Sequence, residues 1–178
     1  STSYIVSEVE NLRKIAQEFL ETSRQATVKK SPINLKGLLE DTIHPYENIL
    51  PEQIQIEKKY KGNFFTIFGD AAKIKIVLRN IITNAIESID KKGTIAFDLQ
   101  ETRDDVKLAV SDTGKGVKPE DLKNIFEPYF STKEGGTGLG LPIAHKIITD
   151  HGGNIQAKLN QNQGMSFVIT LPKHKEQS

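Results

Sequence analysis

Two glycine-rich segments place the strongest constraint on how this chain can fold. They are residues 112–117, Asp-Thr-Gly-Lys-Gly-Val, and residues 135–141, Gly-Gly-Thr-Gly-Leu-Gly-Leu. Glycine lets a backbone turn tightly and approach a ligand closely. The second segment runs into an apolar pattern of helical spacing, and the N–H groups at a helix start attract an anion. The pattern predicts a phosphate-bearing ligand, although it is neither a P-loop nor a dinucleotide fingerprint, and an ordinary loop would share its composition.

Composition excludes several other classes of protein. The 178 residues suffice for one domain or one domain with an appendage, and 24 basic against 23 acidic side chains give no case for nucleic acid as a partner. With no cysteine there is neither a disulfide nor a thiolate metal site. No apolar run reaches the length of a membrane span. We expect a cytoplasmic fragment without membrane contact of its own, cut from a longer chain that could be membrane-anchored.

The first segment, residues 4–25, is amphipathic. Its apolar seam is spaced by alternating steps of four and three, which is typical of a coiled coil or helical bundle: Ile5, Val9, Leu12, Ala16, Phe19 and Ser23. An ordinary surface helix packed on its own domain is the alternative. Residues 29–32, Lys-Lys-Ser-Pro, break the pattern and indicate a linker. We therefore predict a long N-terminal helix with its linker at 1–30 and a separate domain at 31–178.

The rest of the chain alternates between helical and strand patterns. We predict helices at 34–50 with Asn34 as N-cap, at 70–90, at 119–125 and at 139–150. Strands are predicted at 54–60, 64–68, 93–100, 106–111, 154–160 and 165–171. Together they predict an α+β fold, a two-layer sandwich of a mixed sheet with helices on one face.

Three polar side chains carry candidate chemistry. Asn80 and Asn84 lie four residues apart on the predicted helix at 70–90, so both amides point the same way, and an amide oxygen suits Mg²⁺. Two exposed asparagines without a ligand would show the same spacing. Asp112 follows a strand and precedes two glycines, where its carboxylate could accept a hydrogen bond from the exocyclic amine of adenine. A plain Asp-Thr-Gly turn is the alternative.

The segment between the two glycine clusters, residues 126–133, adds aromatic and phosphate-binding candidates. Phe126 and Phe130 could anchor one end of a loop or simply pack in the core. Thr132 and Lys133 could reach phosphates from that loop.

The order of these motifs resembles that of a sensor histidine kinase catalytic domain of the GHKL superfamily. The motifs are Asn80 to Asn84, Asp112 with Gly114 and Gly116, Phe126 to Phe130, Gly136 to Gly140, and finally Gly164-Met165-Ser166-Phe167. The resemblance covers roughly residues 33–172 and is greatest to the nitrogen-regulation sensor kinases. The N-terminal helix is similar to the second helix of the dimerisation and histidine-phosphotransfer hairpin.

The resemblance implies ATP and Mg²⁺ as cofactors, with Asn84 as metal ligand and Asn80, Asn84 and Lys133 as catalytic residues. Asp112 would bind the adenine amine, and Ser166 would replace a threonine that supports Asp112 in the family. The implied ATP-binding residues are Asn80, Asn84, Asp112, Gly114, Gly116, Val117, Phe130, Thr132, Lys133, Gly136, Thr137, Gly138, Leu139, Gly140 and Ser166.

Differences from related families, and from the family's own pattern, bear on the activity that we expect. Related ATPases carry a glutamate base where this chain has Asn80, and an amide cannot take a proton from water, so slow hydrolysis is expected. Glu87 and Ser88 stand where the family usually has a lysine and a tyrosine. Lys133 would then supply the positive charge that binds the phosphates. No histidine of this chain has the context of a phosphoacceptor.

The resemblance implies a transferase of two-component signal transduction. The γ-phosphoryl of ATP would pass to a histidine upstream of this fragment and then to a response regulator receiver domain. The N-terminal helix would allow a homodimer. A nucleotide-gated interaction module without phosphotransfer and a GHKL serine kinase are the alternatives.

Overall fold

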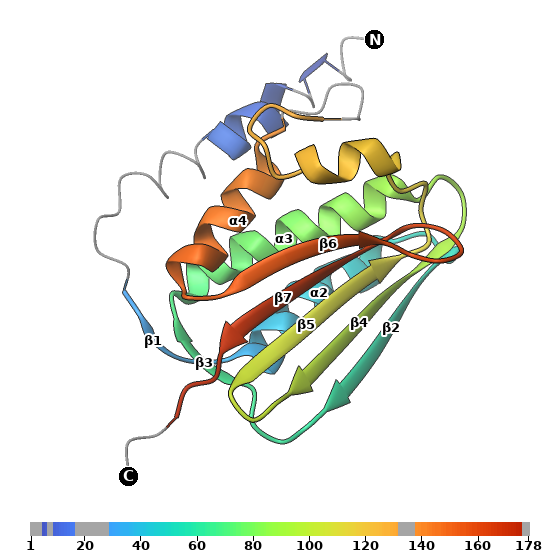
Figure 1. The fold of residues 1–178 in the computed structure, drawn as a ribbon. Helices are drawn as coiled ribbons and strands as arrows, with labels where there is room; N and C mark the ends of the chain where they lie inside the picture. The colour runs from blue at the N-terminus through green and yellow to red at the C-terminus, as the bar shows by residue number, and fades with distance from the viewer. Residues whose placement is uncertain (1–4, 7–8, 17–28, 132–137, 176–178) are drawn as a thin grey trace.

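The computed structural model describes residues 5–6, 9–16, 29–131 and 138–175. Five strands form the main sheet, in the spatial order β2 (Ile54–Lys61), β4 (Gly93–Glu101), β5 (Asp105–Asp112), β7 (Met165–Pro172) and β6 (Asn154–Leu159). β2 pairs with β4 in parallel, whereas the other neighbouring pairs are antiparallel. The predicted mixed sheet is thus confirmed (Figure 1).

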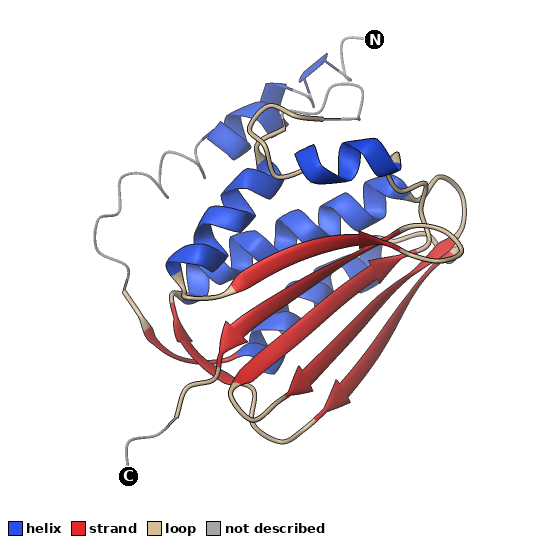
Figure 2. Ribbon diagram, viewed as in Figure 1, coloured by secondary structure: helices blue, strands red, loops and turns tan. Residues whose placement is uncertain are grey.

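Three α-helices cover one face of this sheet: α2 (Leu35–Ile49), α3 (Ala71–Ser88) and α4 (Gly140–Asp150). Figure 2 shows the two layers, with the strands in front of the helices. A 3₁₀ helix, η1 (Pro119–Asn124), follows the sheet strand β5 in the chain. Alternate side chains of the strands and the inner stripes of the helices form one buried core, which confirms the predicted two-layer sandwich.

The central helix α3 has a capped N-terminus, a buried apolar face and two half-buried asparagines beside that face. The Asp70 carboxylate accepts hydrogen bonds from the N–H groups of Ala72 and Lys73, at 3.1 and 3.3 Å, and so caps the helix. Its inner face buries Ile74, Val77, Leu78, Ile81, Ile82 and Ala85. Asn80 and Asn84 are half-buried at the side of this stripe, so the packing of the apolar face fixes where both amides lie.

A small second sheet lies where the sequence indicated a linker. β1 (Ser31–Asn34) pairs antiparallel with β3 (Thr66–Gly69), and Pro32 lies opposite Phe68. The break in pattern at residues 29–32 thus ends in a strand, and residues 31–32 belong to the domain predicted at 31–178. Four residues with a proline carry almost no strand signal, and only the distant partner β3 creates this edge strand. Asn34 caps α2 as predicted, because its Oδ1 accepts from the Gly37 N–H at 3.4 Å.

His151 connects the C-terminal end of α4 to the N-terminal end of α3. It is buried at the C-terminus of α4, where its Nδ1 lies 2.7 Å from the Ile147 carbonyl, and its Nε2 accepts from the Asp70 N–H at 3.0 Å. These partners require the neutral ring with the proton on Nδ1. Burial lowers the pKa of His151, an effect that Lys30 and Lys73 reinforce and that Asp70 and the Ile147 carbonyl oppose. The ring therefore ties the end of α4 to the start of α3.

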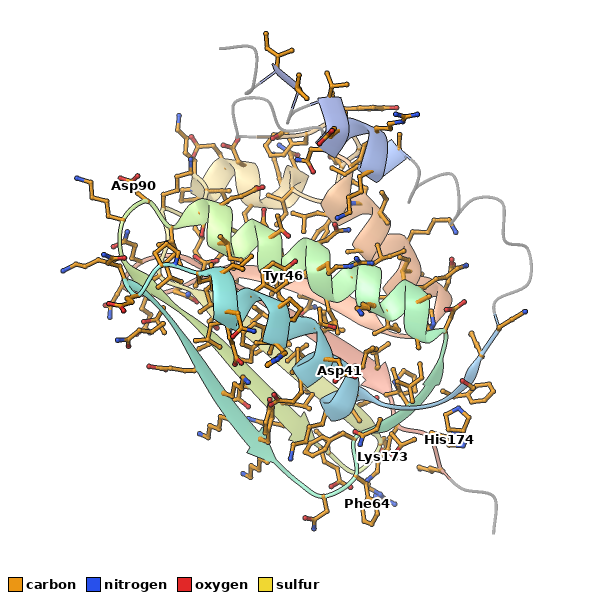
Figure 3. All side chains as sticks on the ribbon, turned by 180° about the vertical axis from the view of Figure 1, so that it is seen from behind. Asp41, Tyr46, Phe64, Asp90, Lys173 and His174 are labelled. Atoms are coloured by element: carbon orange, nitrogen blue, oxygen red, sulfur yellow. The ribbon has the colours of Figure 1, made fainter. Side chains whose placement is uncertain are left out.

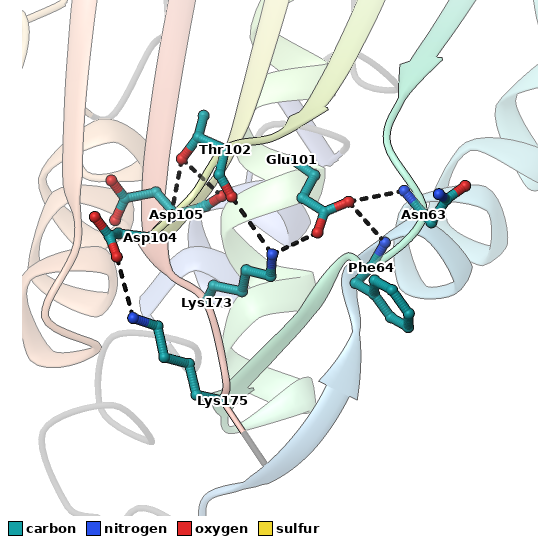
Figure 4. A network of polar contacts seen from close by, with 8 residues as sticks. All are labelled: Asn63, Phe64, Glu101, Thr102, Asp104, Asp105, Lys173 and Lys175. Carbon is teal, nitrogen blue, oxygen red and sulfur yellow. Dashed lines mark hydrogen bonds and ion pairs between the residues drawn. The ribbon is translucent and has the colours of Figure 1, made fainter.

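A polar network closes the end of the sheet at the β4–β5 turn (Figure 4). The Glu101 carboxylate accepts from the N–H groups of Asn63 and Phe64, at 2.8 and 3.0 Å, and forms an ion pair with Lys173. The side-chain bond from Lys173 and these two N–H groups lower the pKa of Glu101 to about 2. In the rear view of Figure 3, Phe64, Lys173 and His174 lie at one end of the molecule and Asp90 at the other. The network is thus remote from the turn that follows α3.

The N-terminal segment is helical at residues 5–6 and 9–16. Ile5, Val9 and Leu12 of the predicted seam are exposed by 62%, 56% and 47%, whereas Ile15 packs against the core. Phe19 and Ser23 of the seam lie outside the described residues, so the bundle role of the whole helix stays a prediction. None of the helices in the described part of the chain is long and apolar enough to cross a bilayer.

Candidate nucleotide-binding site

The two helices that carry the predicted phosphate-binding residues meet through a side chain. The Asn80 Nδ2 on α3 donates to the main-chain oxygen of Gly140, the first residue of α4, at 3.0 Å. Asn84 lies one turn further along α3 and is half-buried. The structure therefore joins Asn80 to the first residue of α4, and the spacing of four places Asn84 on the same side of α3.

The start of α4 differs from the starts of α2 and α3 in how it is capped. Asn34 and Asp70 cap α2 and α3 with their side chains, whereas the N-cap of α4 is Leu139, which gives no side-chain cap. The N–H groups of the first turn carry partial positive charge that a phosphate can satisfy. The helix start thus has the character expected of a phosphate cradle.

Gly138 fixes how the chain enters α4. It adopts φ of 69°, and a Cβ there would lie 2.4 Å from the main chain of Tyr129. The Tyr129 N–H donates to the Gly138 carbonyl at 3.0 Å. These contacts join Gly138 to Tyr129. Of the predicted site residues, Thr132, Lys133, Gly136 and Thr137 lie outside the described residues.

Asp112 lies buried at the end of β5, with an exposed fraction of 3%. Its Oδ1 accepts from the N–H of Gly114 at 2.9 Å and from the N–H of Met165 at 3.4 Å. Gly114 also packs against Ser88 at the end of α3, where the Lys115 N–H donates to the Ser88 carbonyl at 3.0 Å. Two main-chain N–H groups therefore orient the carboxylate at the end of the sheet that α3 also reaches.

Ser166 does not occupy the predicted place beside the Asp112 carboxylate, and this prediction needs correction. Ser166 is paired with Ser111 in the β5–β7 register, so the two side chains share one face of the sheet while Asp112 points to the other. The Ser166 hydroxyl donates to Asn160 Oδ1 at 2.6 Å and lies 2.7 Å from Ser111 Oγ. The side chain on the same face as Asp112 is Met165, because alternate residues of a strand point to opposite faces.

The structure also describes the predicted binding residues at positions 116, 117, 130 and 139. Gly116 adopts φ of 66°, Val117 and Phe130 are half-buried against the core, and Leu139 leads into α4. Phe126 stacks at a tilt on His145, with ring centres 5.5 Å apart, and edge-on against Phe167 at 6.4 Å. The core-contact interpretation of Phe126 is therefore confirmed.

Sequence reasoning overlooked Asn160. Its Nδ2 donates to the main-chain oxygen of Asp112 at 3.0 Å, and its own N–H donates to the Gly164 carbonyl at 3.0 Å. Asparagine at the start of a turn often bonds nearby backbone, and Asn160 precedes the turn 161–164, so a signal was present. Nothing in the sequence indicated that the partner would be Asp112, which lies 48 residues away.

Comparison with known proteins defines the class to which this arrangement belongs. The sequence model described as "Histidine kinase-, DNA gyrase B-, and HSP90-like ATPase" matches residues 69–175. The match runs from the end of β3 through the asparagine pair, Asp112 and α4 to the end of the described chain. The chain therefore belongs to this ATPase family.

Individual relatives narrow the resemblance to sensor kinases. The chain is 34% identical over 170 residues to the sensor histidine kinase ZraS of Salmonella typhimurium, covering 94% of this chain and 37% of that protein. It is 32% identical to sporulation kinase C of Bacillus subtilis, covering 94% of this chain and 40% of that one. The chain thus spans well under half the length of these relatives.

Solved structures agree with the fold. The catalytic domain of histidine kinase ThkA is 32% identical, with a TM-score of 0.73, and covers 82% of this chain and 98% of that one. ThkA in complex with the response regulator protein TrrA gives a TM-score of 0.83 at 29% identity, covering 98% of this chain and 51% of that chain.

Proposed function

We propose that this chain is the ATP-binding catalytic part of a two-component sensor histidine kinase, acting in the cytoplasm. It passes the γ-phosphoryl of ATP to a histidine that lies upstream of Ser1 in the parent protein. The observation that carries the proposal is the Asn80 amide held on the Gly140 carbonyl, with Asn84 on the same side of α3. An amide at position 80 cannot act as the base for water, so ATP persists until another acceptor arrives.

Different residues bind different parts of ATP. Asp112 accepts from the exocyclic amine of adenine, and the start of α4 takes the phosphates. The positive charge of Lys133 stabilises the negative charge that develops on the transferred phosphoryl group. In phosphoryl transfer the protein contributes chiefly position and charge neutralisation, which fits a site without a general base.

The donor set also fits Mg²⁺. Among the residues that the structure describes, no group of three His, Cys, Asp or Glu side chains could hold a metal ion. Mg²⁺ needs no such cage, because it takes one or two protein oxygens and completes its shell with phosphate oxygens and water. Asn84 provides the neutral oxygen, and Asn80 assists at the phosphates. When bound with ATP, the ion neutralises charge on the phosphates.

Three partners follow from the proposed chemistry. The first is the hairpin helix that carries the acceptor histidine, to which the exposed seam at Ile5, Val9 and Leu12 offers an apolar surface. A second copy of the chain could meet the same seam in a homodimer. The third partner is a response regulator receiver domain; ThkA has been solved in complex with the response regulator protein TrrA.

Phosphotransfer to the upstream hairpin tests the proposal. The chain is mixed with the hairpin of its parent protein, Mg²⁺ and γ-labelled ATP, beside an Asn84→Ala variant. We expect a label on the hairpin that is labile in acid and stable in base, and that the variant abolishes. Nucleotide binding without any label would instead identify a nucleotide-gated interaction module. An acid-stable label would identify hydroxyl phosphorylation, as a serine kinase gives.

A further inference from the structure

The turn between β6 and β7 is bound to Asp112 through a single side chain, Asn160. One amide makes two contacts in opposite directions: its Nδ2 donates to the Asp112 main-chain oxygen at 3.0 Å, and its Oδ1 accepts from Ser166 at 2.6 Å. The Asn160 N–H closes the turn on the Gly164 carbonyl at 3.0 Å. Asn160 therefore links the turn, β7 and the end of β5.

The partners of this amide fix its direction. The Ser166 proton is given to Asn160, so Ser166 Oγ accepts from Ser111, which lies 2.7 Å away. The opposite orientation of the amide would point its oxygen at the Asp112 carbonyl, with two acceptors face to face. The Asp112 carbonyl, which can only accept, thus sets the Asn160 donor toward Asp112, and the Ser166 hydroxyl holds the Oδ1 on the other side.

Gly164 places the turn against Asp112 without an intervening side chain. A Cβ on Gly164 would lie 1.9 Å from the Asp112 main-chain oxygen and 2.8 Å from its Oδ1. The next residue, Met165, donates its N–H to that same Oδ1. The turn that Asn160 closes therefore contacts both the main chain and the carboxylate of Asp112.

The strand on the other side holds the Asp112 segment as well. The Thr113 N–H donates to the Thr94 carbonyl at 3.2 Å, and Thr113 Oγ1 accepts from the Thr94 N–H at 2.9 Å. The peptide that follows Asp112 is thus held from β4 by Thr113 and from the β6–β7 turn by Asn160. Two fixed points on opposite sides hold this peptide, and the N–H groups of Gly114 and Met165 then orient the carboxylate.

We propose that Asn160 is a positioning residue for nucleobase recognition: it orients Asp112 so that the carboxylate meets the exocyclic amine of a purine. The inference rests on the proposed function, because it takes Asp112 as the partner of adenine. Asn160 itself does not touch the ligand. It acts through the main chain of Asp112 and through the turn that supplies the Met165 N–H.

A pair of nucleotides separates this role from a merely structural one. ADP carries the exocyclic amine, whereas purine riboside diphosphate lacks it and keeps the ring system and the phosphates. Calorimetric titration gives the Kd of each for the wild-type chain and for Asn160→Asp, a substitution of the same shape that replaces the donor to Asp112 with an acceptor. We expect Asn160→Asp to weaken ADP binding about tenfold, roughly the worth of one hydrogen bond, and to leave the Kd of purine riboside diphosphate unchanged.

Two further variants support the comparison. Ser166→Ala removes the hydroxyl that donates to Asn160 Oδ1 and helps to hold the amide, so it should give a smaller loss, again confined to ADP. This variant carries the test if Asn160→Asp does not fold. Gln161→Ala changes an exposed side chain of the same turn and should alter neither Kd. Equal weakening of both nucleotides, or unaltered ADP binding by Asn160→Asp, would overturn the role of Asn160.

The test also separates this inference from the proposed function. If the wild-type chain binds both nucleotides equally, Asp112 does not contact the exocyclic amine, and the role of Asn160 is refuted with it. That result leaves phosphotransfer itself untouched. Conversely, discrimination between the nucleotides needs no acceptor histidine. A failure of phosphotransfer would therefore leave the role of Asn160 standing.

Discussion

Substituting Gly164 by alanine should be among the most damaging single-methyl changes in this chain. Gly164 adopts φ of 91°, and a Cβ there would lie 1.9 Å from the Asp112 main-chain oxygen. An L-residue in left-handed backbone costs about 1–2 kcal/mol, and overpacking a well-filled site costs about 1–3 kcal/mol more. The free energy of unfolding should fall by the sum of both terms, about 2–5 kcal/mol.

Gly152 provides a matched control. It adopts φ of 71°, and its nearest neighbour to an added Cβ is the Pro172 ring at 3.7 Å, an ordinary contact. Gly152→Ala should therefore cost only the backbone term of about 1–2 kcal/mol. The entropy that alanine removes from the unfolded chain is common to both variants and cancels in the comparison. The difference between them isolates the contact with Asp112.

Urea unfolding at equilibrium, read by circular dichroism, measures both free energies. ADP binding should also weaken in Gly164→Ala, because the clash falls on the residue that we assign to adenine, and should persist in Gly152→Ala. Equal destabilisation by the two substitutions would refute the reasoning, since it would mean that the turn moves away from Asp112 at no cost.

Three other perturbations have defined outcomes. Burial lowers the pKa of His151 below 6.5, so its contribution to stability is complete above pH 6.5 and declines as the pH falls through that value; His151→Gln should remove this part of the pH dependence of unfolding. Lys173 and two N–H groups lower the pKa of Glu101 to about 2, so its contribution is complete above pH 4.5 and declines from there towards pH 2; Glu101→Gln should flatten the acid limb. Lys133→Ala should raise the Kd of ATP or slow phosphotransfer, because it removes the cation that we assign to the phosphates.

Each of these predictions has a result that would contradict it. For His151, the slope of unfolding free energy on either side of about pH 6.5 would be the same in wild type and variant. For Glu101, the two acid limbs would superimpose. For Lys133, both the Kd of ATP and the rate of transfer would remain at their wild-type values.

Local pattern was sufficient to predict most of the elements. Apolar residues at helical spacing located α3, and strand patterns located β4, β5 and β7. The short strand β1 was missed, because a strand of four residues that contains Pro32 gains its hydrogen bonds only from β3, more than 30 residues later. Strand pairing between distant segments leaves little trace in local sequence.

In the candidate site, too, some features follow from local sequence and others from strand pairing. The spacing of four between Asn80 and Asn84 places both amides on one side of any helix, so the sequence alone could predict their common direction. The register of β7 against β5 was not available from the sequence, and a shift of one residue exchanges the faces of Met165 and Ser166. That exchange is why the predicted contact of Ser166 with the Asp112 carboxylate was wrong.

The sequence by itself determined the helix that carries the asparagine pair, the glycine-rich entry into α4 and the placing of Asp112 at a strand end, because each depends on interactions between residues close in the chain. Only the tertiary structure decided that Asn160 meets Asp112, that His151 is held neutral between two helices, and that Met165 rather than Ser166 shares the face of Asp112. Those outcomes depend on strand register and on burial, which arise when segments distant in sequence pack together.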